Sequence, residues 1–227
     1  ACAALAKQHG LISMIDNSYA SPIFQRPHEL GIDLVIHSGT KYLNGHSDVV
    51  VGVICGSKEK IQNIFYREYM TLGPIISPND AALVIRGLRT LELRMKQSDQ
   101  SAQLIAQRLT EHPKVKSVLH PLLPTFPQYE LAKRQMSGAG GLFSAHFAAT
   151  SLESMERFTH ALLDSKRFSM AVSWGGHKSL ALPTAAFYGI PGRTDSPIPW
   201  TLVRFYIGLE DPEWLWEGIE EAMGYIE

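Results

Sequence analysis

The sequence predicts an α/β fold with a large, mostly parallel-sheet domain over residues 1–110 and a smaller α/β domain over residues 111–227. Three observations lead to this fold class. Short, nearly continuous apolar runs early in the chain are typical of strands buried on both faces. One helical pattern over 78–111 is long enough to connect two lobes. Strands and helices alternate again after it, which indicates a second α/β unit.

The first part of the chain is predicted to hold a short helix, three strands and a further helix. Residues 1–9 form the first helix, and Gly10 ends it. The strands are the apolar runs, and Asn44-Gly45 marks the turn before the third of them. Cys55 closes that third strand and is expected to be a reduced core thiol. The expected strand ranges are 11–16, 32–37 and 49–55. Turn residues with one helical turn are expected over 21–31, and the second helix over 58–71.

The long helix has a clear start and a clear stop. Ser77 is the expected N-cap, with Pro78 at the first helical position. The helix then continues to Glu111, where His112-Pro113 stops it. Beyond it, strands are predicted over 115–119, 141–147, 168–173 and 201–207, and helices over 128–136, 151–164 and 212–226.

Composition excludes several classes of function. The formal net charge of the 227 residues is −1, and no basic stripe exists, so nucleic acid is not an expected partner. The apolar runs are too short to span a bilayer, so no membrane partner is expected. Two cysteines do not make a disulfide framework, and we expect a cytoplasmic protein.

A lysine flanked by small polar residues follows the second predicted strand. Lys41 stands in "HSGTKYLNGHSD", with hydroxyls at Ser38 and Thr40. Desolvation at a strand end lowers the pKa of an amine and makes it nucleophilic. From an extended segment Ser38 and Thr40 would point the same way and could hold a phosphate. A solvated loop lysine with two loop hydroxyls is the plainer interpretation of this stretch alone.

Asp16 ends the first predicted strand, and in open α/β sheets ligands bind beyond the carboxyl ends of strands. Alone, Asp16 is more typical of a turn or N-cap residue. The combination of Asp16 with Ser38, Thr40 and Lys41 points instead to pyridoxal phosphate. That cofactor needs a lysine for its aldehyde, an acid for its pyridinium nitrogen and donors for its phosphate.

A third group of residues lies in the second part of the chain. Arg204 occurs in an otherwise apolar strand, and a guanidinium there suits a carboxylate, such as that of an amino acid; a solvent-facing arginine is the alternative. The pair Ser173-Trp174 opens "SWGG", whose glycines allow backbone N–H groups to approach a ligand, or form only a tight turn. No metal site is expected, because the spacing of His37, His46 and Asp48 matches no zinc motif.

Five stretches occur in the order seen in one known family. They are "MIDNSYASP", "HSGTKYLNGHSDVVVG", "SPNDAALVIRGLRTLELRM", "SWGGHKSL" and "LVRFYIGLEDPE". The chain thereby resembles the Cys/Met-metabolism pyridoxal-phosphate enzymes over essentially its whole length. This family includes cystathionine γ-synthases, cystathionine β-lyases, cystathionine γ-lyases and methionine γ-lyases. The resemblance implies an aspartate-aminotransferase-like fold (type I), with residues 1–110 as the remainder of the cofactor-binding domain.

The resemblance also implies a role for each candidate residue. Lys41 would be the Schiff-base lysine and proton shuttle, and Asp16 would pair with the pyridinium nitrogen. Ser38 and Thr40 would bind the phosphate. The substrate, a sulfur amino acid, would be held by its α-carboxylate on Arg204, Ser173 and the Trp174 backbone. The implied assembly is a dimer of dimers with sites shared between subunits, acting in transsulfuration and methionine biosynthesis.

Trp174 gives the resemblance its finer direction, because most other members carry leucine there. It resembles bacterial cystathionine β-lyases most, which implies β-elimination of cystathionine to homocysteine, pyruvate and ammonia. A γ-synthase, γ-lyase or methionine γ-lyase is the alternative within the family. His177 and Lys178 depart from the family pattern, in which a glutamate usually occupies the position of Lys178.

The family's N-terminal part is expected to be missing from these residues. That part would carry a tyrosine stacked on the cofactor and a glycine-rich turn for its phosphate. The apolar run 11–16 would then expose an edge. We therefore expect these residues alone to supply about half of an active site and to be inactive and poorly soluble. A catalytically silent fragment that folds only with a partner is the alternative of another class.

Overall fold

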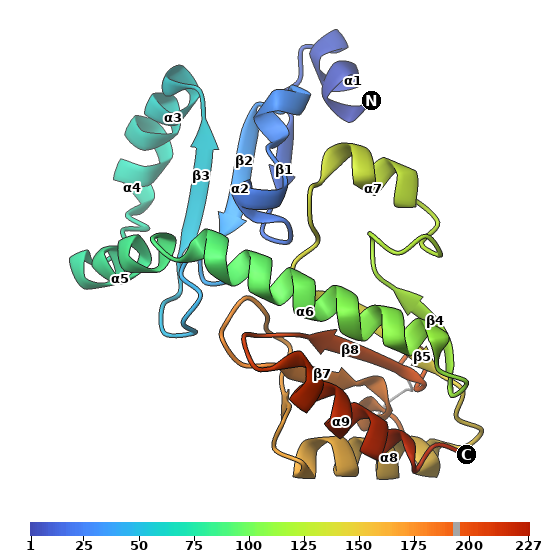
Figure 1. Ribbon diagram of the computed structural model, residues 1–227. Helices are drawn as coiled ribbons and strands as arrows, with labels where there is room; N and C mark the ends of the chain where they lie inside the picture. The colour runs from blue at the N-terminus through green and yellow to red at the C-terminus, as the bar shows by residue number, and fades with distance from the viewer. Residues whose placement is uncertain (193–195) are drawn as a thin grey trace.

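The computed structural model of the protein describes residues 1–192 and 196–227. Within them, the α/β class is confirmed: two sheets lie on either side of the long helix α6 (Leu91–Glu111), as Figure 1 shows. The first sheet has the order β1-β2-β3 and the second β4-β5-β8-β7-β6. The strands are β1 (Met14–Asp16), β2 (Leu34–Ser38), β3 (Gly52–Gly56), β4 (Val115–Leu119), β5 (Leu142–Phe147), β6 (Ser169–Met170), β7 (Leu180–Pro183) and β8 (Leu202–Tyr206).

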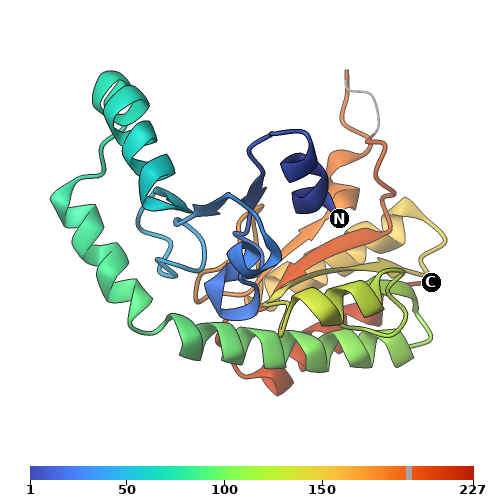
Figure 2. The same ribbon diagram turned by 90° about the horizontal axis from the view of Figure 1, so that it is seen from above.

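Helices lie beside both sheets, and Figure 2 shows α3 and α4 standing away from the second sheet. The predicted helix over 58–71 is present, with a π-helical stretch over Phe65–Tyr69. The helices are α1 (Cys2–Gln8), α2 (Ser21–Phe24), α3 (Lys58–Ile64), α4 (Met70–Leu72), α5 (Pro78–Leu88), α7 (Tyr129–Gln135), α8 (Leu152–Asp164) and α9 (Pro212–Met223), with 3₁₀ turns over Pro27–Leu30 and Thr184–Phe187.

The first sheet is mixed, because β1 pairs parallel with β2 and β2 antiparallel with β3. Only β2 matches the expectation of strands buried on both faces: Leu34 and Val35 are both buried. Met14 on β1 and Ile54 on β3 are exposed instead. The expectation was wrong for β1 and β3, since continuous apolar sequence does not by itself supply covering elements on both faces.

The third strand is shorter than predicted, and its cysteine is not in the core. Thr40 bonds both backbone groups of Val51. The Val51 N–H donates to the Thr40 hydroxyl at 2.9 Å, and the Thr40 N–H donates to the Val51 carbonyl at 3.2 Å. The strand therefore begins only at Gly52. Cys55 is exposed, as Cys2 is, so the prediction of a core thiol was wrong.

The predicted long helix is two helices. It begins at Ser77, whose hydroxyl accepts from the Asp80 N–H as an N-cap, and this prediction is confirmed. It then breaks at Arg89 and Thr90, whose N–H groups donate three residues back, to Arg86 and Gly87. No proline marks the break. The break occurs where Gly87 packs on the backbone carbonyl of Asn44, in the turn that follows β2. Helical periodicity cannot reveal this contact.

The second sheet differs from prediction at its edge. The strand predicted over 168–173 is only β6, and the sequence analysis missed β7, which lies between β6 and β8. β7 ends in Pro183, and its four residues give too short a pattern to distinguish from a loop.

One face of the second sheet carries the main core. Phe143 of β5 lies opposite Phe205 of β8, and their rings stack at 5.5 Å. Helices α6, α8 and α9 supply the other core residues, so they cover this face. Side chains alternate along a strand, so Arg204 and Tyr206 lie on the opposite face of β8. That face turns towards the first sheet, and Tyr206 packs there with Tyr42.

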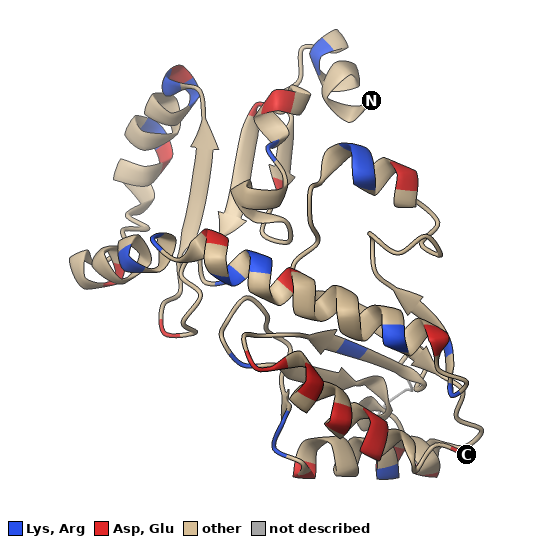
Figure 3. Ribbon diagram, in the orientation of Figure 1, with Lys and Arg blue, Asp and Glu red and all other residues tan. Residues whose placement is uncertain are grey.

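Helix α6 contributes Ala102, Ile105, Ala106 and Leu109 to the core of the second sheet. A boundary at residues 110/111 therefore stays a prediction, since the connecting helix packs with the unit that follows it. Figure 3 shows acidic residues, in red, gathered along α9. Arg108 of α6 forms an ion pair with Glu213 of α9 at 2.7 Å. None of the described helices has an apolar stretch long enough to cross a bilayer.

A buried histidine beside this core makes stability depend on pH. His120 is 0 % exposed; its Nδ1 accepts from the Leu122 N–H at 3.2 Å, and burial lowers its pKa to about 4. The unfolded chain, with an ordinary histidine pKa near ~6.5, therefore takes up a proton first as the pH falls. We expect the unfolding free energy to drop by about 3 kcal/mol between pH 6.5 and pH 4 through this group.

The variant His120→Asn tests this expectation, because the Asn side-chain oxygen can still accept from Leu122 and does not titrate. Urea unfolding of the whole protein at pH 7 and pH 4.5 should show a smaller loss of stability for this variant than for the native protein. His160→Asn, on the exposed side of α8, is the matched control and should keep the native pH dependence. Equal acid sensitivity of all three proteins would contradict the assignment.

Candidate active site

The lysine turn follows β2 directly. The Lys41 N–H donates to the Ser38 carbonyl at 3.0 Å, and the Gly45 N–H donates to the Lys41 carbonyl at 2.8 Å. Residues 39–44 thus form consecutive hydrogen-bonded turns. Ser38 is the extended last residue of β2 but Thr40 lies in a turn, so the expectation that both project from one extended segment was wrong. Gly39 is required here, because a Cβ at this position would lie 2.8 Å from the Val51 side chain.

The two hydroxyls beside Lys41 have different surroundings. The Thr40 hydroxyl accepts from the Val51 N–H at 2.9 Å and also contacts the Val51 carbonyl at 3.4 Å, so it is engaged with backbone. Ser38 is half-exposed, and its N–H donates to the Ser18 hydroxyl at 2.6 Å. That bond ties the lysine turn to the loop after β1.

Asp16 ends β1 and lies at the same sheet edge as Ser38. The register pairs Asp16 with Ile36, two residues before Ser38 on the parallel neighbour. The Asp16 side chain is exposed and accepts from the Ser18 N–H at 2.8 Å, which is the geometry of a turn aspartate. The loop 16–18 therefore joins Asp16 to Ser38 through Ser18.

The second half of the site comes from the second sheet. The Lys41 amine donates to the Ser173 hydroxyl at 2.9 Å and lies 4.6 Å from the centre of the Trp174 ring. Arg204 donates from Nη2 to the Ser173 carbonyl at 3.1 Å and to the Ala171 carbonyl at 3.3 Å. Four of the predicted residues, Lys41, Ser173, Trp174 and Arg204, are thus brought together from segments far apart in the chain.

The charges at this meeting point are unbalanced. Burial lowers the pKa of Lys41, and the nearby Arg204 lowers it further. Burial also lowers the pKa of Arg204, whose buried Nε has no hydrogen-bond partner among the described residues. Neither cation forms an ion pair with a carboxylate within the described parts of the chain. A half-buried guanidinium that lacks a carboxylate partner favours an anionic ligand such as a carboxylate.

A cavity of about 600 Å³ opens at this point. Thr40, Ser173 and Trp174 line its inner part. Its outer wall comes from two segments that touch, since a Cβ on Gly176 would lie 2.5 Å from the Ser47 hydroxyl. That wall carries the charged or titratable side chains Asp48, His177 and Lys178. The cavity is large enough for a small amino acid and a cofactor ring.

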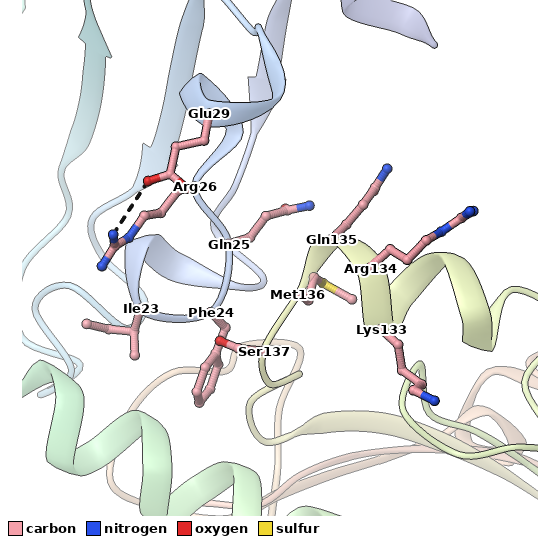
Figure 4. A pocket seen from close by; sticks show the side chains of 10 residues that line it. All are labelled: Ile23, Phe24, Gln25, Arg26, Glu29, Lys133, Arg134, Gln135, Met136 and Ser137. Atoms are coloured by element: carbon pink, nitrogen blue, oxygen red, sulfur yellow. Dashed lines mark hydrogen bonds and ion pairs between the residues drawn. The ribbon is translucent and has the colours of Figure 1, made fainter.

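A second cavity, of about 430 Å³, lies between the loop after α2 and the end of α7. Figure 4 shows its lining, with the ion pair of Arg26 and Glu29, 3.5 Å long, on one wall. Both of these side chains are exposed, and Lys133 pairs with Glu130 at 3.8 Å. None of the predicted site residues lines this cavity, so the chemistry of the protein is expected at the other one.

Comparison with known proteins shows the family of the chain. Residues 1–224 match the family described as Cys/Met metabolism PLP-dependent enzyme. The chain belongs to this family. It is 44% identical to the L-methionine gamma-lyase of Pseudomonas deceptionensis over 98% of this chain and 56% of that protein. It is 40% identical to the human cystathionine gamma-lyase, over 98% of this chain and 55% of that protein. It is 39% identical to the Mycobacterium leprae cystathionine gamma-synthase, over 91% and 53%.

The chain thus spans about half the length of the curated relatives it matches. Pyridoxal 5'-phosphate is the cofactor of this family of PLP-dependent enzymes, and the predicted cofactor is confirmed at that level. The residues of this chain fit it: a half-buried amine with a lowered pKa bonds Ser173, which lines the cavity, and a guanidinium without a carboxylate partner among the described residues bonds the same residue.

The sequence analysis missed the residues that fix the loop carrying Ser173 and Trp174. The Tyr206 hydroxyl donates to the Gly176 carbonyl at 2.7 Å. Glu210 accepts from the Ser179 N–H and the Ser179 hydroxyl, each at 2.8 Å. Both residues lie in the stretch "LVRFYIGLEDPE", in which Arg204 was the residue given a predicted role. Polar residues directly following the apolar strand that holds Arg204 were the available signal.

Proposed function

We propose that this chain carries the catalytic lysine of a PLP-dependent carbon–sulfur lyase acting on sulfur amino acids. The observation that carries the proposal is the meeting of Lys41 with Ser173 and Trp174, with Arg204 bonded to the same segment. An amine with a lowered pKa beside an unpaired guanidinium suits an amino-acid substrate, because one group handles a proton and the other holds a carboxylate.

Each residue has one task in this proposal. Lys41 takes the α-proton of the substrate and delivers a proton to the leaving sulfur, which its lowered pKa favours at neutral pH. Arg204 holds the α-carboxylate, assisted by Ser173 and the Trp174 backbone. Asp16 would hold the pyridine nitrogen of the cofactor, and Ser38 and Thr40 would hold its phosphate. When bound, pyridoxal phosphate withdraws electrons from the substrate Cα.

The reaction that we propose is β-elimination of cystathionine to homocysteine, pyruvate and ammonia. Its support is Trp174, a large ring that packs against the Lys41 amine where most family members carry the smaller leucine. A ring there narrows the space next to the reacting amine, which favours cleavage close to Cα. The protein is further proposed to work in the cytoplasm as a homo-oligomer with shared sites.

A γ-elimination is the second candidate, and the relatives favour it. One of them, 44% identical, is named as a methionine gamma-lyase, and another, 40% identical, as a cystathionine gamma-lyase. The two reactions give different products from cystathionine: β-elimination releases pyruvate and homocysteine, and γ-elimination releases 2-oxobutyrate and cysteine.

Product analysis of the full-length protein separates the candidates. With cystathionine as substrate, we expect pyruvate to exceed 2-oxobutyrate by about tenfold or more, since a preference of ~1.4 kcal/mol between two barriers gives that ratio. Trp174→Leu is the matched variant and should raise the 2-oxobutyrate share, while folding is checked by thermal melting. A native protein that forms mainly 2-oxobutyrate would overturn the β-elimination proposal and leave the lyase proposal standing.

A further inference from the structure

The break between α5 and α6 lies against the back of the lysine turn. Gly87, one residue before the end of α5, would place a Cβ 2.2 Å from the Asn44 carbonyl oxygen. Gly45 has φ +73°, and a Cβ there would lie 1.9 Å from Arg94 Nη1. Backbone therefore packs directly on backbone and on a guanidinium. The turn that carries Lys41 thus packs against the end of α5, the start of α6 and the Arg94 side chain.

Arg94 donates hydrogen bonds both to the lysine turn and to the helix break. Its Nη1 donates to the Tyr42 carbonyl at 2.8 Å, its Nη2 to the Gly87 carbonyl at 2.8 Å, and its Nε to the Thr90 hydroxyl at 3.1 Å. The planar fork of a guanidinium can span such a set of acceptors, and a lysine amine on its flexible stem cannot hold all three in one plane. The fork thus joins the residue after Lys41 to the helix break.

The burial of Arg94 is unusual for a group with neutral partners only. The side chain is buried, and its three partners are two carbonyls and a hydroxyl, with no carboxylate pair within the described parts of the chain. Burying a charge is costly unless hydrogen bonds and a counter-charge compensate it. The negative end of the α5 dipole, at the Gly87 carbonyl, offsets part of this cost.

We propose that Arg94 is a positioning residue that fixes the lysine turn, so that the Lys41 amine lies at Ser173 and Trp174. This inference rests on the proposed function for its effect on activity, and on the contacts above for its effect on the turn. The Tyr42 carbonyl belongs to the residue that follows Lys41, in the peptide between residues 42 and 43, so holding it restrains the backbone of the turn from which the amine extends. A misplacement of ~1 Å at a reacting group costs about 100-fold in rate.

The test compares Arg94→Lys with Arg108→Lys in the full-length protein. Arg108 lies on the same helix, but pairs with Glu213 away from the lysine turn, so it is the matched control. For Arg94→Lys we expect kcat to fall by about 10- to 100-fold and KM to stay within about threefold. KM should change little because Arg204, which we propose to bind the substrate, lies on β8 and not on α6. The pH at which the absorption of the bound cofactor titrates should also shift.

Amide hydrogen exchange gives a readout that does not depend on activity. Residues 42–45 should exchange at least about tenfold faster in Arg94→Lys than in the native protein and in Arg108→Lys, since the turn loses its fixed partner. Faster exchange over residues 42–45 in Arg94→Lys, together with a native protein that lacks lyase activity, would support the positioning role and refute the proposed function. Unchanged exchange over residues 42–45 in Arg94→Lys, together with an active native enzyme, would refute the positioning role alone.

A milder variant covers the case in which Arg94→Lys does not fold. Thr90→Val removes the hydroxyl that the Arg94 Nε bonds and keeps the shape of the side chain. We expect a fewfold loss of kcat, an unchanged KM and faster exchange over residues 42–45. A native kcat together with native exchange in this variant would overturn the positioning role, as would an Arg94→Lys protein that is native in kcat and in cofactor titration.

Discussion

Replacing Lys41 by alanine is expected to reduce carbon–sulfur cleavage by about 1,000-fold or more. The side chain is the amine that contacts Ser173 and Trp174, and burial next to Arg204 lowers its pKa. Losing a positioned proton-transfer group alone costs about 100- to 10,000-fold. Lyase activity of the full-length Lys41→Ala protein, measured as keto-acid release, checks this expectation.

The covalent attachment of the cofactor gives a second measurement on the same residue. Borohydride reduction followed by peptide mapping of the native protein should find pyridoxyl-lysine at Lys41. Lys58→Ala, at the exposed start of α3, is the control and should keep both activity and the adduct. An adduct on another lysine, or Lys41→Ala with native turnover, would show that the site had been assigned to the wrong amine.

Changing Asp16 to asparagine is expected to reduce elimination by at least about 100-fold while the cofactor stays bound. Asparagine keeps an oxygen that can accept from the Ser18 N–H, so the turn after β1 is retained and only the charge is removed. A charged partner at the pyridine nitrogen strengthens electron withdrawal from the substrate, and its loss slows the step that Lys41 assists.

The measurements for Asp16→Asn are turnover, cofactor content by absorbance and melting temperature. Native cofactor content and melting with a large loss of kcat is the expected combination. Asp80→Asn, in the first turn of α5, is the matched carboxylate control and should leave kcat unchanged. Near-native turnover of Asp16→Asn would contradict the proposed role and leave Asp16 as the turn residue that its bond to Ser18 describes.

Local sequence patterns predicted much of the framework. The apolar runs gave β1, β2 and part of β3, because short apolar runs bounded by turn residues favour strands even where, as in β1 and β3, the side chains are not fully covered. The Ser77-Pro78 start of α5 was also readable, since an N-cap bond forms within one turn of the chain. The same locality placed Asp16 and Lys41 after strands, which was enough to predict the cofactor.

Predictions that depended on distant partners were the ones that the structure changed. Cys55 is exposed although its strand is apolar, because burial depends on which elements cover the sheet. The long helical pattern breaks at Thr90 because the 41–45 turn and Arg94 pack against the break. Helical periodicity continues through the break, and no residue in the local sequence signals it.

The sequence by itself determined the chemistry available to this protein: its α/β class, its family, and a lysine, an acid and an arginine in suitable places. Only the tertiary structure decided which of these groups meet. Lys41 lies 2.9 Å from Ser173 because the outer face of β8 turns towards the end of β2. Side-chain type is a property of one position, whereas a contact across 132 residues depends on how both sheets pack on α6.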